Sequence, residues 1–153
     1  MVTTLLILHA LMSVALLGAI THQALSTYRR PAPAQSFVGR FAAVAGASYT
    51  NAIIVLFLLT AVLGNLVYPQ YRLDVRTSLE DLNMRAANGV FEIKEHFAAI
   101  GMFMLPLYWL YWRTPLKPDY AAARRWLTTI LAFIVWWNFL VGHILNNIKG
   151  FGQ

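Results

Sequence analysis

The sequence contains no cysteine among its 153 residues. Disulfides, thiolate-ligated iron–sulfur clusters and covalently attached c-type haem all need cysteine, so the sequence excludes all three. Any metal in this protein must therefore be held by histidine, carboxylate, methionine or backbone oxygen.

Charged residues are also scarce: they make up 12% of the chain, whereas 59% of its residues are hydrophobic. This composition is typical of an integral membrane protein. The formal net charge is +6. Because the basic residues lie in short connections beside apolar runs, this charge predicts a membrane topology, and we expect no binding to nucleic acid.

Four apolar runs approach the ~20 residues that a helix needs to cross a bilayer. They cover residues 4–27, 41–67, 91–112 and 125–147. The first is expected to be a true span, because the residues before it include no lysine or arginine. The sequence shows no internal repeat and no shift in composition. We therefore predict a single all-α domain over residues 1–153, an integral membrane four-helix bundle.

The connection over residues 69–90 is the longest between these runs. Thr77 and Glu80 have the spacing of a capping box, and Asn88–Gly89 is a typical helix stop. We expect a short amphipathic helix here, lying on the outer membrane surface.

Consecutive spans alternate in direction, so the connections sort onto two sides. One side carries a single acid, Asp119, and an excess of basic residues: Arg29, Arg30, Arg40, Arg113, Lys117, Arg124 and Arg125. Such an excess marks the cytoplasm. Both termini and the 69–90 connection are therefore predicted to be outside, in the periplasm if the membrane is a bacterial inner membrane.

Three of the four histidines fall in one layer of this topology. His9 lies near the start of the first span, His96 near the start of the third and His143 near the end of the fourth, each within roughly 5–8 Å of the outer end of its span. His22 lies near the opposite end. Helical spacing puts Glu92 on the His96 stripe and Asn147 on the His143 stripe.

Ionisable residues at membrane depth usually face the interior and indicate a functional site. In one interpretation, His9 and His96 are the axial ligands of a b-type haem, with His143 able to replace either and Asn147 binding a propionate or a quinol. In the other, all three histidines bind a non-haem zinc, copper or iron ion together with Glu92. Lys94 and Glu95 are expected to reach the interface.

Two stretches, "LHALMSVALLGAITHQALSTYRR" and "FEIKEHFAAIGMFMLPLYWLYWR", carry a family resemblance. With His9, Gly18 and Lys94 at corresponding places, the chain resembles the small four-helix membrane haem b proteins grouped around copper-resistance protein D and the membrane-bound protoporphyrinogen oxidase. The resemblance implies a haem-binding role for His9 and functional importance for Lys94.

The favoured function is one-electron transfer by a membrane b-type haem, between quinol or a periplasmic donor and a partner redox protein. Glu92 is then the candidate proton acceptor. Two alternatives remain open: a non-haem metal enzyme or transporter, and a cofactor-free accessory subunit of a larger membrane complex. We expect the chain to contact the lipid bilayer and to form an oligomer or to be a subunit of a larger complex.

Overall fold

The computed structural model describes residues 2–29, 36–42 and 44–148, and every regular element in these ranges is helical. The predicted all-α class is confirmed. The four long helices are α1 (Val2–Ser26), α3 (Thr50–Gln70), α5 (Arg85–Trp112) and α6 (Ala121–Ile148). The short elements are α2 (Phe37–Ala42), the 3₁₀ turns η1 (Gly46–Tyr49) and η3 (Pro118–Tyr120), the π-helical turn η2 (Tyr71–Val75), and α4 (Arg76–Asp81).

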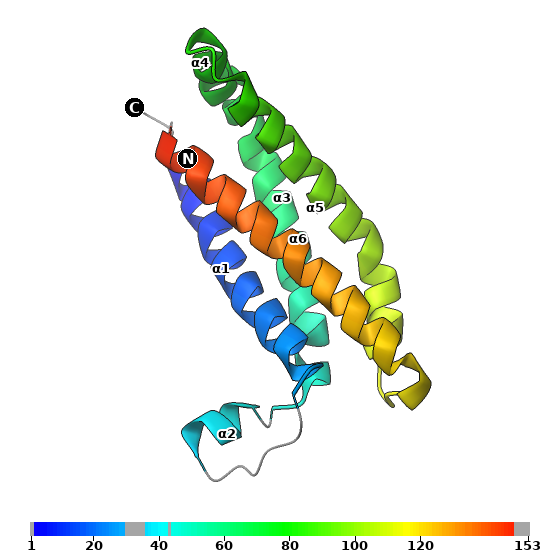
Figure 1. Ribbon diagram of the computed structural model, residues 1–153. Helices are drawn as coiled ribbons and strands as arrows, with labels where there is room; N and C mark the ends of the chain where they lie inside the picture. The colour runs from blue at the N-terminus through cyan, green and yellow to red at the C-terminus, as the bar shows by residue number, and fades with distance from the viewer. Residues whose placement is uncertain (1, 30–35, 43, 149–153) are drawn as a thin grey trace.

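The long helices run side by side, and each packs mainly on two others. Helix α1 packs on α3 and α6, and α5 packs on α6 and α3 (Figure 1). The start of α1, the end of α6 and α4 lie at one end of the molecule, which we call the α4 end. Helix α2 and the α5–α6 connection lie at the other, the α2 end.

Three described segments are long and apolar enough to cross a membrane: Val2–Ser26, Gly46–Asp81 and Pro118–Ile148. Helix α5 is not among them, since its first half is charged and its last turns are rich in tyrosine and tryptophan. Large apolar side chains are exposed on all four long helices, among them Phe103 of α5 at 85%. Water would oppose that exposure, whereas lipid tails accept it.

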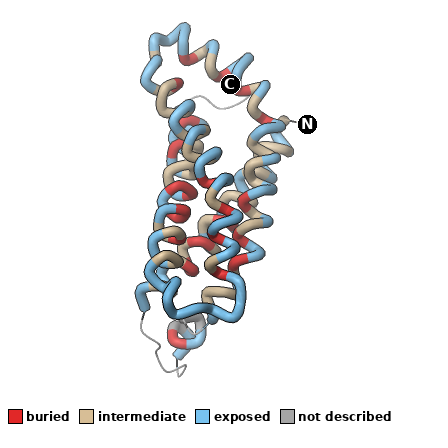
Figure 2. Tube along the Cα trace, turned by 90° about the vertical axis from the view of Figure 1, so that its right-hand side faces the viewer, coloured by how far each residue is buried: buried red, intermediate tan, exposed pale blue. Residues whose placement is uncertain are grey.

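The core lies between the inner faces of the long helices, as the buried positions in Figure 2 show. Its members recur at helical spacing on each helix, for example Leu16 and Ile20 on α1 and Ile53 and Phe57 on α3. Helices α3 and α5 approach closely at Gly101, where a Cβ atom would lie 2.7 Å from Cζ of Phe57. That position therefore requires glycine or a shifted phenylalanine.

The predicted 69–90 connection is largely wrong. Helix α3 continues through Pro69 into η2 and α4. Proline cannot donate a backbone hydrogen bond, and the π-helical turn that follows it accommodates the disturbed register. Helix α4 exists, but as the extension of α3, and this extension forms with the start of α5 a hairpin that projects beyond α1 and α6 (Figures 1 and 2).

The helix stop was predicted five residues too late, at Asn88 instead of Asn83. Asn83, at φ 57°, ends α4 in the left-handed conformation that asparagine tolerates. The amide of Met84 donates to the Leu79 carbonyl at 2.8 Å and that of Asn83 to the Glu80 carbonyl at 2.9 Å, which is a Schellman motif. Helix α5 therefore begins at Arg85, and Asn88–Gly89 lie within it.

Candidate functional site

His9 is half-buried on α1, against α3. Its Nδ1 lies 3.0 Å from the backbone carbonyl oxygen of Thr60. Because a carbonyl only accepts, Nδ1 carries the proton and donates, and in the neutral ring Nε2 then has a free lone pair. This is the arrangement that metal-ligating histidines usually adopt.

Gly64, one turn after Thr60, gives the ring its space. A Cβ atom at this position would lie 3.1 Å from Cε1 of His9. The missing side chain lets α1 and α3 approach with an imidazole between them. The carbonyl and the glycine of one helical turn thus hold His9 in place.

Lys94 comes from α5 and is also half-buried. Its stem packs on α6, with Cε 3.6 Å from the place of a Cβ atom on Gly142, and its Nζ lies 4.8 Å from the centre of the Phe91 ring. Its charge is close enough to interact with His9. The predicted interfacial position of Lys94 is therefore wrong: Lys94 faces the interior and joins His9 in what we call the His9–Lys94 layer.

His96 faces the other way. Its ring is exposed, and its Nδ1 donates to the backbone carbonyl of Glu92 on the same helix at 2.7 Å. The predicted inward orientation of His96 is wrong, and the reason is geometric. Lys94 and His96 are two residues apart, about 200° around the helix, so a rotation that buries one exposes the other.

His143 and Asn147 also lie on an outer face of α6. His143 is exposed, and its ring stacks on Phe139 of the same helix with the centres 6.3 Å apart. Asn147 donates through Nδ2 to the His143 carbonyl at 2.9 Å. The structure therefore does not assemble the predicted histidine trio, and its described residues contain no group of three or more histidines and carboxylates able to hold a metal ion.

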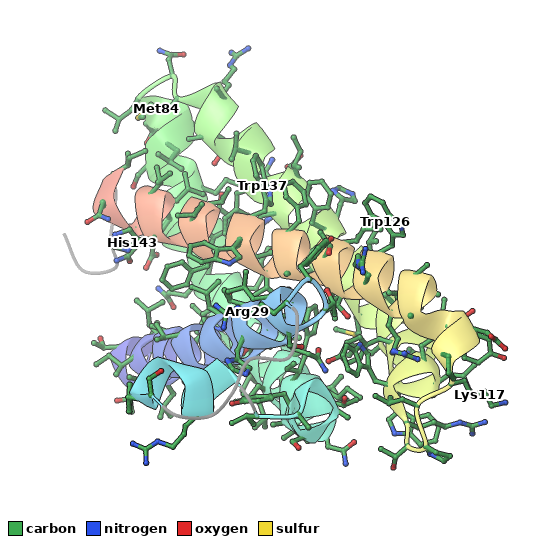
Figure 3. The ribbon with its side chains drawn as sticks, turned by 60° about the horizontal axis from the view of Figure 1, so that its bottom comes forward. Arg29, Met84, Lys117, Trp126, Trp137 and His143 are labelled. Atoms are coloured by element: carbon green, nitrogen blue, oxygen red, sulfur yellow. The ribbon has the colours of Figure 1, made fainter. Side chains whose placement is uncertain are left out.

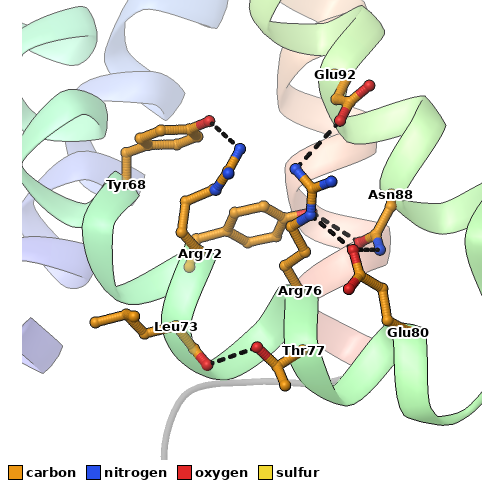
Figure 4. A network of polar contacts seen from close by, with 9 residues as sticks. Tyr68, Arg72, Leu73, Arg76, Thr77, Glu80, Asn88 and Glu92 are labelled. Atoms are coloured by element: carbon orange, nitrogen blue, oxygen red, sulfur yellow. Dashed lines mark hydrogen bonds and ion pairs between the residues drawn. The ribbon is translucent and has the colours of Figure 1, made fainter.

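The two carboxylates Glu92 and Glu95 also face the opposite way to the prediction. Glu92 is exposed and accepts from Arg76 at 3.3 Å, and Arg76 also donates to Glu80 at 2.8 Å (Figure 4). Glu95 is instead half-buried, near the Tyr68 hydroxyl and close to the charge of Lys94. Glu95, not Glu92, is the carboxylate beside the interior layer.

Aromatic side chains lie between the His9–Lys94 layer and the tip of the hairpin, and polar contacts hold them. Arg72 donates to the Tyr68 hydroxyl at 3.3 Å (Figure 4). Tyr71 donates to Oδ1 of Asn88 at 3.2 Å, and its ring stacks on Phe91 with the centres 3.6 Å apart. Aromatic rings thus separate Lys94 from the exposed charges at the tip of the hairpin.

Oγ1 of Thr60 and Nε1 of Trp137 are buried polar atoms without a hydrogen-bond partner among the described residues. Thr60 is the residue whose carbonyl binds His9. Trp137 lies on α6 against Phe97 of α5, with ring centres 5.9 Å apart. A buried polar group without a partner costs free energy, so a polar partner at either atom would be favourable.

A second polar cluster, nearer the α2 end, escaped the sequence analysis. Fully buried Gln23 accepts from the Tyr108 hydroxyl, and its amide donates to the Gly46 carbonyl at 3.0 Å and to Oγ1 of Thr50 at 3.2 Å. We call it the Gln23 cluster. Its signal in the sequence was a glutamine inside an apolar run, beside His22, whose ring packs on Tyr49 with centres 4.7 Å apart.

Comparison of the chain with protein-family models, curated proteins and solved structures gives no match. The site is therefore interpreted from its own geometry.

Proposed function

We propose that this chain is a four-span membrane protein that binds one b-type haem at the His9–Lys94 layer and transfers single electrons. The proposal rests on His9 and Lys94, two half-buried side chains of which the Lys94 charge is close enough to act on the His9 ring. They come from α1 and α5, face the interior together, and are the two residues to which the family resemblance assigns roles.

The residues present fit such a group in their chemistry. With Nδ1 held by the Thr60 carbonyl, His9 would hold the haem iron through Nε2. Gly64 and Oγ1 of Thr60 lie on α3, which packs on His9, and Nε1 of Trp137 lies on α6, where its ring contacts Phe97 of α5. Of the histidines predicted for this layer, only His9 faces the interior, so the proposal has one ligating imidazole and gives up the predicted His9–His96 pair.

Haem, when bound, supplies reversible one-electron chemistry. The chain's own residues do the rest. The Lys94 ammonium, which is half-buried, would pair with a propionate carboxylate. Glu95 takes over the role expected of Glu92: a carboxylate close to the layer that accepts a proton when a quinol is oxidised.

The placement in the membrane is part of the proposal. Helix α5 packs along both α3 and α6, so it lies at the same depth as two helices apolar enough to span. Arg29, Arg40 and the basic residues of the α5–α6 connection belong to the α2 end. The positive-inside rule then puts that end in the cytoplasm and both termini in the periplasm of a bacterial inner membrane.

The test is a visible spectrum of the gently solubilised protein, oxidised and then reduced with dithionite, with haem and metal analysis of the same sample. We expect a sharp b-type band and about one haem per chain. His9→Ala should lose the haem, and the matched variant His143→Ala should keep it. Stoichiometric metal without porphyrin would instead favour a non-haem site, and a chain with neither would favour the accessory-subunit interpretation.

A further inference from the structure

A small hollow lies at the turn between α5 and α6, at the α2 end and far from the His9–Lys94 layer. Its volume is about 110 Å³, and it is lined by Leu110, Tyr111, Arg113, Pro115, Lys117 and Tyr120. Lys117 lies at this turn, at the opposite end of the molecule from Met84 (Figure 3). The lining combines two cations with aromatic and apolar side chains.

Aromatic rings, and not carboxylates, hold the cations of this turn. The Arg113 guanidinium lies 5.8 Å from the Trp109 ring centre, the Lys117 ammonium 5.6 Å from Tyr120, and the Arg124 guanidinium 5.9 Å from Trp112. Within the part of the chain that the structure describes, ion pairs occur only at Arg76. Because a ring face attracts the charge without accepting each N–H, the donors of Arg113 and Lys117 remain available to an anion.

The turn is also held in one shape. Arg124 donates to the backbone carbonyl of Lys117 at 2.7 Å. Tyr111 and Tyr120 meet edge to face with ring centres 5.0 Å apart. A site whose side chains are already positioned loses less entropy when it binds its ligand.

The surroundings point to a lipid. Trp109, Leu110 and Leu116 are exposed large hydrophobic residues directly beside the hollow. Tryptophan and tyrosine above an apolar helix surface mark the level of the headgroups. A ligand here therefore meets cations at one end and lipid-facing apolar side chains at the other.

We propose that this hollow binds the phosphate of an anionic phospholipid headgroup, with Arg113 and Lys117 as the donors. The acyl chains of that lipid lie along the exposed apolar side chains at the end of α5. Basic pockets between membrane helices are suited to such headgroups. This proposal is independent of haem binding.

The experiment titrates the purified full-length chain, in neutral detergent, with soluble short-chain phosphatidylglycerol and measures the heat of binding. The test variant is Arg113→Gln/Lys117→Gln. The matched control is Arg85→Gln/Arg125→Gln, which removes the same charge outside the hollow; Arg125 lies over the Tyr28 ring and Arg85 at the start of α5. We expect affinity to fall about tenfold or more in the test variant and less than about twofold in the control.

Three results would overturn the proposal. Equal losses in both double variants would mean that only the general charge matters. Equal affinity of the wild-type chain for short-chain phosphatidylcholine would remove the preference for an anionic headgroup. Displacement of the lipid by inorganic phosphate at concentrations similar to that of the lipid would assign the hollow to a soluble phosphate. The haem spectrum of both double variants should match that of the wild type.

Discussion

The Gln23 cluster and the His9–Lys94 layer are two polar regions inside the same apolar bundle, and they differ in chemistry. In the Gln23 cluster, neutral groups from α1, α3 and α5 pair with one another, and the hydroxyl of Tyr108 and the amide of Gln23 both find partners. In the His9–Lys94 layer the side chains are ionisable, and two buried polar atoms nearby lack partners. Polar groups that all have partners stabilise the contacts between helices. Ionisable groups beside polar atoms that lack partners are instead typical of a site that binds a ligand.

The largest expected effect tests whether the Gln23 cluster stabilises the fold. Gln23→Leu should lower the free energy of unfolding by about 2 kcal/mol, because the buried Tyr108 hydroxyl loses its acceptor. Denaturation in mixed detergent measures this change. The haem content of the folded fraction should stay at the wild-type level. Loss of haem with unchanged stability would reverse the roles of the two regions.

The next largest effect is expected at Lys94. Lys94→Gln should weaken haem binding about tenfold, equivalent to about 1.4 kcal/mol, because a charged partner for a propionate is lost. The matched variant, His96→Gln, changes an exposed side chain two residues away and should have no effect. Haem titration of the apoprotein compares the two. If His96→Gln proved the more damaging, the rotation of α5 described above would be wrong.

The long helices could be predicted from the sequence, but the rotation of α5 could not. Apolar run lengths predicted the helical class and all four long helices, since burial and backbone hydrogen bonding dictate them locally. The layer predicted from the pattern consisted of His9, His96 and His143, with Lys94 and Glu95 at the interface, and only His9 of these histidines lies in the interior layer of the structure. The pattern made His96 the inward-facing residue and Lys94 the interfacial one, and both predictions were wrong, because helix rotation depends on packing against other helices.

The helix boundaries failed for a related reason. Pro69 looked like the start of a loop, but a π-helical turn continues the helix beyond it. The true stop, Asn83, is an ordinary exposed asparagine whose significance lies in its backbone conformation. The Gln23 cluster was missed because its partners, Thr50 and Tyr108, lie 27 and 85 residues away along the chain.

A smaller effect should come from Gly64. Gly64→Ala places a methyl group where His9 already packs, 3.1 Å from Cε1, so the ring must shift by a few tenths of an ångström. We expect a loss of about 1 kcal/mol in stability or in haem affinity, the range typical of mild overpacking. Gly18→Ala is the control, since nothing lies within 4 Å of the position of its Cβ atom. Equal behaviour of the two variants would mean that α1 and α3 are not held together at His9.

The smallest expected effect is a change in the pH dependence of the midpoint potential, which distinguishes Glu95 from Glu92. If Glu95 exchanges a proton when the electron is transferred, the midpoint potential of the wild type should fall as pH rises, by up to about 59 mV per pH unit. Glu95→Gln should flatten that dependence, because its amide cannot take up the proton. Glu92→Gln should leave it unchanged, because Glu92 is exposed and paired with Arg76 on the hairpin. Redox titrations at several pH values measure the slope, and a flattening confined to Glu92→Gln would return the proton-accepting role to the surface of the hairpin.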